Sequence, residues 1–140
     1  MSRSSKRFST ALAAATILVA GAVRAAAPEP QDTVGAGEIQ YRSNCAVCHG
    51  LEARGDGPLS AFLTKKPTNL RGLTQAHGGT FPFGQIYDVI DGRGKIGAHG
   101  TREMPVWGAN WKADAAEGFG ETYVRGKILE MIIYLRSIQD

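Results

Sequence analysis

The sequence predicts an all-α fold, a small domain of about four short helices joined by long loops. Two observations support this prediction. Apolar residues recur at helical spacing in several segments, and no segment shows the strict alternation of a half-buried strand. Without the N-terminal leader, about 115 residues remain, which is enough for one small core but near the lower limit.

The N-terminus has the pattern of a secretory signal peptide. Arg3, Lys6 and Arg7 precede an uncharged, alanine-rich stretch, and small residues around Ala25 form a cleavage site. A retained membrane anchor is the alternative, although the stretch is short for a span of ~20 residues. We therefore expect three parts: a signal peptide at 1–25, a flexible lead-in at 26–33 and a folded domain at 34–140.

The net charge of +3 comes from the leader, which holds four of the sixteen basic residues and no acidic one. The expected mature chain keeps twelve basic residues against thirteen acidic ones. This near-neutral balance gives no support to nucleic-acid binding. We also expect no membrane span once the leader is removed.

The first helix is predicted from about Thr33 to Cys45, with Asp32 as its N-cap. Gly37, Tyr41 and Cys45 are spaced four residues apart, so they share one helix face. A small residue, an aromatic ring and a thiol therefore lie in one row.

Two shorter helices are predicted from proline and glycine signals. The first covers about 59–65, because Pro58 suits the first turn of a helix. The other covers about 83–91, begins after Pro82 and ends at Gly92.

The last helix has the clearest pattern and is predicted over about 121–138. Its apolar residues recur at intervals of three and four, which gives a helix with one buried stripe. The stripe consists of Val124, Ile128, Met131, Leu135 and Ile138.

The motif at the end of the first helix carries the chemistry. Cys45 and Cys48 are the only two cysteines of the chain, and His49 follows them directly. This Cys-x-x-Cys-His pattern is the attachment signature of a c-type haem. One helical turn brings both sulfurs to the two vinyl groups of a porphyrin edge, and the imidazole then faces the iron. A covalent cofactor also explains the long loops expected at 66–82 and 92–113, which would wrap around it.

The two cysteines have three alternative interpretations. A thioredoxin-like pair needs a βαβ setting, which the sequence does not predict. A zinc site needs two further ligands, and His77 and His99 are loosely spaced for that role. A disulfide would close a strained short loop and leave His49 unexplained.

With these elements placed, the chain resembles the class I c-type cytochromes, in particular their bacterial periplasmic monohaem members. The resemblance covers essentially the whole expected mature chain. Three features carry it: the haem motif, a Met-Pro loop and the terminal helix. In the family, a glycine and an aromatic residue on the first helix contact the last helix, and here these would be Gly37 and Tyr41 against residues 131–135. The runs at 55–58 and 66–70 also look like those of the bacterial members. It implies a small cytochrome c fold around one covalent haem, a periplasmic location, and first and last helices that cross closely.

The resemblance also implies the iron ligands. Residues 101–108 look like the family loop that supplies a methionine sulfur, so Met104 is the expected distal ligand opposite His49. His99 and His77 remain rivals, and Met131 reads as a core residue. Two further haem contacts are expected: the carbonyl of Pro67, which would accept the other ring proton of His49, and Trp107 near the haem edge.

The expected function is one-electron transfer between redox partner proteins, by a protein that is not an enzyme. The Ser, His and acidic residues form no recognisable catalytic triad or carboxylate pair. One alternative is a cytochrome subunit held permanently in a larger oxidoreductase. Another is a haem enzyme or gas-binding protein whose distal iron site is open.

Overall fold

The computed structural model describes residues 30–94 and 104–140, and these parts of the chain contain helices and no strand. The all-α prediction is confirmed for them. The expected signal peptide, residues 26–29 of the lead-in, and His99 lie outside the described residues. Within the described ranges, no helix is long and apolar enough to cross a membrane.

The motif lies at a break between two helices. Helix α1 spans Pro30–Asn44 and α2 spans Ala46–His49, with Cys45 between them. The backbone N–H of Cys45 still bonds to the Tyr41 carbonyl at 2.8 Å. The prediction of Asp32 as N-cap is wrong, because α1 begins two residues earlier at a proline, which suits a first turn.

The prediction of a helix over 59–65 is also wrong, because only a single 3₁₀ turn, η1 at Ser60–Phe62, forms there. The backbone N–H of Leu59 donates to Val47 at 2.9 Å, and that of Gly57 donates to Cys48 at 3.1 Å. The chain here therefore bonds back onto α2, and at Leu63 the backbone is extended.

Both segments predicted as long loops contain helical turns. The 66–82 segment holds η2 at Leu70–Gly72 and α3 at Leu73–Ala76, and the second segment contains most of α5 at Trp107–Asp114. Helix α5 has no clear apolar stripe, so its sequence did not predict it. The helix is anchored by Trp111, which is buried in the core, and the Trp107 ring stacks on Trp111 with ring centroids 5.5 Å apart.

The two remaining predicted helices are confirmed. Helix α4 spans Phe83–Asp91 and ends at Gly92, whose φ of 67° is the left-handed conformation that glycine adopts at a helix end. Helix α6 spans Gly120–Ser137. The predicted stripe on α6 is buried except at Ile138, which is partly buried, and the buried face also includes Ile132 and Tyr134.

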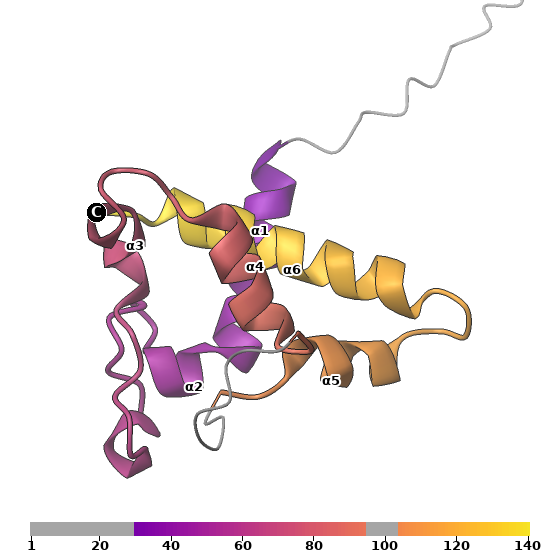
Figure 1. The fold of residues 1–140 in the computed structure, drawn as a ribbon, viewed down its shortest axis with the longest axis horizontal. Helices are drawn as coiled ribbons and strands as arrows, with labels where there is room; N and C mark the ends of the chain where they lie inside the picture. The colour runs from indigo at the N-terminus through magenta and orange to yellow at the C-terminus, as the bar shows by residue number, and fades with distance from the viewer. Residues whose placement is uncertain (1–29, 95–103) are drawn as a thin grey trace, which may run out of the picture.

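Helix α6 is the centre of the fold, and α1, α4 and α5 all pack against it (Figure 1). Its most extensive contact is with α1, at Gly37. A Cβ on this glycine would overlap the Glu130 carbonyl and lie 2.7 Å from Tyr134 Cβ, so only glycine permits this close approach. One turn later, Tyr41 packs on Tyr134 with ring centroids 5.3 Å apart.

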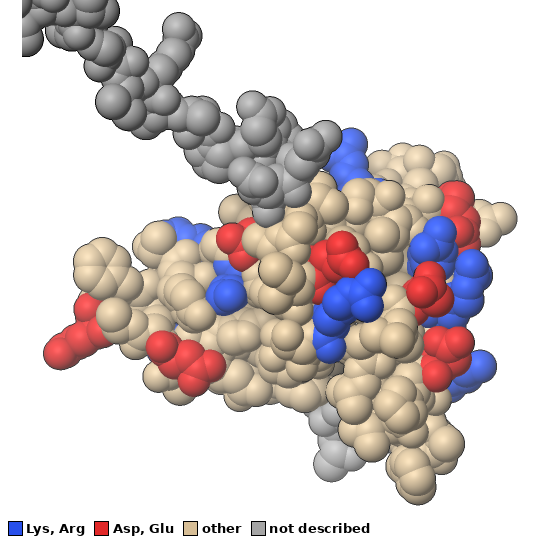
Figure 2. Space-filling model, turned by 180° about the vertical axis from the view of Figure 1, so that it is seen from behind, with Lys and Arg blue, Asp and Glu red and all other residues tan. Residues whose placement is uncertain are grey.

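The surface carries charges of both signs. On the face shown in Figure 2, basic and acidic side chains are interspersed. This distribution agrees with the near-neutral charge expected for the mature chain.

Candidate functional site

A cavity of about 340 Å³ lies beside the motif. It is bounded by α1 and α2, by the turns at 68–73, by α4 and by α6, and most of its wall is apolar. The side chains from α4 and α6 that line it include Ile86, Ile90, Met131 and Leu135. A flat apolar body would be held here between helices from both halves of the chain.

The wall also carries three kinds of iron- or porphyrin-binding group. Cys45 and His49 line the cavity from the motif, and Met104 lines it from the chain just before α5. The structure thus brings Met104 to the same cavity as Cys45 and His49 of the motif, which lie more than 50 residues earlier in the sequence. Cys48 is half-buried and is not among the lining residues.

The imidazole of His49 is oriented by one hydrogen bond. Its Nδ1 lies 3.0 Å from the carbonyl oxygen of Thr68. A carbonyl only accepts, so Nδ1 carries the proton and Nε2 keeps its lone pair. Burial lowers the pKa of His49, and the bond to Thr68 opposes this shift only in part. The ring is therefore neutral and presents Nε2 as a metal donor.

The carbonyl of Pro67 was expected to accept the ring proton of His49. In the structure, the acceptor is the carbonyl of the next residue, Thr68. The Pro67 carbonyl faces Gly55 on the other side of the segment. Neighbouring carbonyls of an extended chain point in opposite directions, so only one of the two can reach the imidazole. No sequence pattern indicated which one it would be.

The two cysteines are free thiols in different environments. Burial, and then the charge of Cys48, raise the pKa of Cys45 to about 12. A thiol with such a pKa stays protonated at neutral pH and is a poor spontaneous nucleophile.

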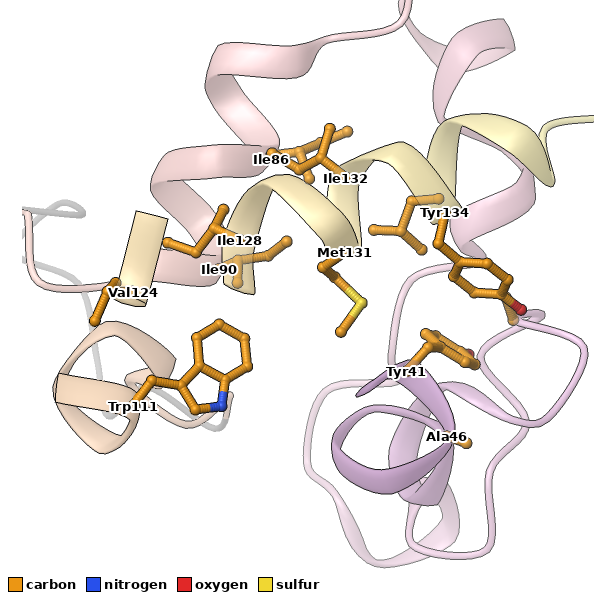
Figure 3. Packing of buried hydrophobic residues seen from close by; sticks show 12 residues of the cluster. Tyr41, Ala46, Ile86, Ile90, Trp111, Val124, Ile128, Met131, Ile132 and Tyr134 are labelled. Carbon is orange, nitrogen blue, oxygen red and sulfur yellow. The ribbon is translucent and has the colours of Figure 1, made fainter. Parts of the chain in front are cut away.

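Two other candidate ligands named from the sequence, Met131 and His77, also line the cavity. Met131 is fully buried, as expected of a core residue, yet it also lines the cavity. Figure 3 shows its side chain pointing from α6 into the space between Tyr41 and Trp111. His77 lines the cavity too, with Nδ1 2.8 Å from the Leu73 carbonyl and Nε2 3.0 Å from Gln85 Oε1.

Trp107 is not among the cavity-lining residues. Its ring stacks on Trp111 at the start of α5, where it packs against the core. Trp107 therefore follows Met104 closely in the chain, but its ring packs on Trp111 and does not line the cavity.

Leu70 and Leu73, which line the cavity, were not predicted from the sequence. A usable signal was Asn69, whose side chain accepts the backbone N–H of Arg71 and so begins η2. Read as a helix start, this residue would have placed both leucines on an ordered turn.

The residues present fit a covalently held haem. The cavity offers an apolar wall, a thiol, a neutral imidazole with a free Nε2, and a thioether. The described residues contain no βαβ unit and no group of three His, Cys, Asp or Glu side chains able to hold a metal ion. A scan against protein-family models and searches of curated proteins and of solved structures returned no match.

Proposed function

We propose that this protein is a c-type cytochrome, a periplasmic one-electron carrier with the small cytochrome c fold. One haem c would be joined to Cys45 and Cys48 and ligated by His49 and Met104. The observation that carries the proposal is the shared cavity, whose apolar wall holds the cysteine and histidine of the motif together with a methionine from a distant part of the chain.

The chemistry of these side chains suits electron transfer. When bound, the haem supplies an iron that takes up and releases one electron. His49 offers Nε2 on a ring that Thr68 holds in one orientation. The thioether of Met104 is a soft donor that favours the reduced iron and so raises the reduction potential. A site with both donors in place leaves no open position for a substrate.

The helix arrangement supports the fold assignment. The close contact of Gly37 with α6, and of Tyr41 with Tyr134, is the helix crossing that the resemblance implied. The crossing fixes the end of α1, from which the motif continues, against the same helix that supplies Met131 and Leu135 to the cavity wall.

The partners in this proposal are redox proteins that dock transiently. A cytochrome subunit of a larger oxidoreductase is the second candidate, because the same site would serve both. Gel filtration of the native extract separates the two: a free carrier elutes at the size of one small domain, and a subunit elutes with its complex.

Met104→Ala in the haem-loaded protein tests the proposed site. We expect loss of the weak far-red absorption band of methionine-ligated ferric haem and a large downward shift of the midpoint potential. Met131→Leu is the matched control, since it removes the other cavity thioether at similar volume and should leave the band in place.

A far-red band that survives in Met104→Ala would overturn the assignment of Met104 and transfer the distal role to Met131. A wild-type spectrum that has no such band and is unchanged in Met104→Ala would transfer the role to His77 or His99. A high-spin ferric spectrum, or ready CO binding by the reduced wild-type protein, would favour the haem enzyme or gas-binding alternative. Neither result is expected for a carrier with both axial positions filled.

A further inference from the structure

A cluster of charged side chains joins the end of α4 to the last turn of α5 and the start of α6. Arg93 Nε lies 2.5 Å from Asp91 Oδ1, and Arg93 Nη1 lies 2.9 Å from Glu121 Oε1. Lys112 Nζ lies 2.7 Å from the same Glu121 oxygen. Asp91, Arg93, Lys112 and Glu121 are called the Arg93 cluster below.

The inner part of the Arg93 cluster is sheltered from water. The Asp91 and Arg93 side chains are 18% and 26% exposed, whereas Glu121 is 53% exposed. Hydrogen bonds from Arg93, and then from Lys112, lower the pKa of Glu121 to about 2. The bond to Asp91, followed by that to Glu121, raises the pKa of Arg93. Arg93 and Glu121 are therefore both charged at neutral pH.

The cluster sits directly on the first turn of α5. A Cβ on Gly108 would overlap Asp91 Oδ1 and lie 2.6 Å from Arg93 Nε. Only glycine at this position lets α5 approach the Asp91–Arg93 pair so closely. The cluster and Gly108 together fix where α5 begins.

Met104 lies four residues before Gly108, and ordered backbone connects the two. The Trp107 N–H bonds to the Pro105 carbonyl at 3.1 Å, and the Ala109 N–H bonds to the Val106 carbonyl at 3.1 Å. A displacement of the first turn of α5 would therefore move Met104 along the cavity wall.

We propose that the Arg93 cluster is a positioning device for Met104: it seats the first turn of α5 against α4 and α6 and thereby holds the thioether at the cavity. None of its side chains lines the cavity, so it acts through α5. The inference rests on the proposed function, because it concerns how firmly Met104 stays on the iron.

The test is Arg93→Gln in the full-length, haem-loaded protein, with two readouts: the far-red band and the binding of added imidazole to the ferric protein. We expect a weaker band and imidazole binding about tenfold faster. The variant loses the guanidinium that pairs with Asp91 and Glu121, and this loss favours displacement of Met104. Arg93→Lys keeps the charge without the guanidinium and should restore part of the effect. Gly108→Ala should act in the same direction by pushing the cluster away from α5.

Arg42→Gln is the matched control, because it breaks an ion pair of the same kind, 2.8 Å from Glu38 on α1, outside the cavity wall. It should leave both readouts unchanged. If Arg93→Gln lowers the melting temperature yet moves neither readout, the cluster is only structural and the inference is overturned. If Arg93→Gln does not take up haem, Glu121→Gln takes its place as the test. This variant removes one of the two carboxylate partners of Arg93 and must change the far-red band and imidazole binding in the same direction, by a smaller amount.

The same measurements separate this inference from the proposed function. If Met104→Ala itself changes neither the band nor imidazole binding, the His49/Met104 assignment fails. If Met104→Ala changes both and the Arg93 and Gly108 variants change neither, only the positioning role fails.

Discussion

The two donor-bearing sides of the cavity are held by different forces. On the His49 side, the motif is fixed by backbone hydrogen bonds, by the Thr68 carbonyl and by the close α1–α6 contact at Gly37. On the Met104 side, α5 is fixed by the charged Arg93 cluster and by the indole of Trp111, which is buried in the core.

The difference has a physical consequence. Buried backbone hydrogen bonds and tight packing resist salt and change of pH, whereas partly exposed ion pairs are screened by salt and depend on charge. The His49 side is therefore held rigidly, and the Met104 side is held by contacts that salt and pH can weaken. The variants below disturb the two sides in turn, from the largest expected effect to the smallest.

His49→Ala should have the largest effect, a complete loss of stable haem incorporation. The motif would lose the imidazole that Thr68 orients toward the cavity. The measurement is haem staining of the protein on a denaturing gel, together with its visible spectrum. Met104→Ala is the comparison, and it should retain covalent haem. Equal haem content in both variants would contradict the contrast between the two sides.

Gly37→Ala should destabilise the fold by ~3 kcal/mol, because its Cβ would overlap the backbone of α6. Denaturant unfolding measures the change in the free energy of unfolding. Gly35→Ala is the control in the same helix, since a Cβ there meets nothing within 4 Å and should stabilise by a few tenths of a kcal/mol or more. Similar results for both variants would show that α1 and α6 are not in close contact at Gly37.

Tyr41→Phe should cost about 1–2 kcal/mol, because the buried Tyr41 hydroxyl donates to the Gly50 carbonyl at 2.5 Å. Burial is also the first cause that raises the pKa of Tyr41 above its ordinary value of 10.0. The protonated form is thus favoured in the folded state, so its contribution is complete below pH 10 and declines as the pH rises toward the higher folded pKa.

The free energy of unfolding of the wild-type protein should therefore fall above pH 10, and Tyr41→Phe should flatten that fall. Tyr123→Phe, at an exposed position, is the control and should leave the slope unchanged. An unchanged slope in Tyr41→Phe would show that this phenol is not buried in solution.

Glu121→Gln should have the smallest effect, which should be present at neutral pH and disappear in acid. Hydrogen bonds from Arg93 and Lys112 lower the pKa of Glu121 to about 2, so its contribution to stability is present above pH 4.5 and is lost as the pH falls toward 2. The wild-type advantage over the variant should shrink across this window and with added salt. Thermal melts at several pH values measure it, and an advantage that persists at pH 2 would contradict the ion-pair assignment.

The sequence by itself determined the features that depend on local spacing. The 3.6-residue stripe of α6, the proline and glycine that bound α4, and the i, i+4 row of Gly37 and Tyr41 are all properties of consecutive residues. The candidate site was predictable to the same extent, since Cys45 and His49 belong to one short motif.

Only the tertiary structure decided what depends on the path of the chain between these elements. It selected the carbonyl of Thr68 over that of Pro67, because neighbouring carbonyls of an extended segment face opposite ways. It also formed α5, which has no apolar stripe of its own and depends on the buried indole of Trp111 and on the Arg93 cluster. Periodicity records which side of a helix is apolar, whereas the partner that covers that side is fixed only when distant segments meet.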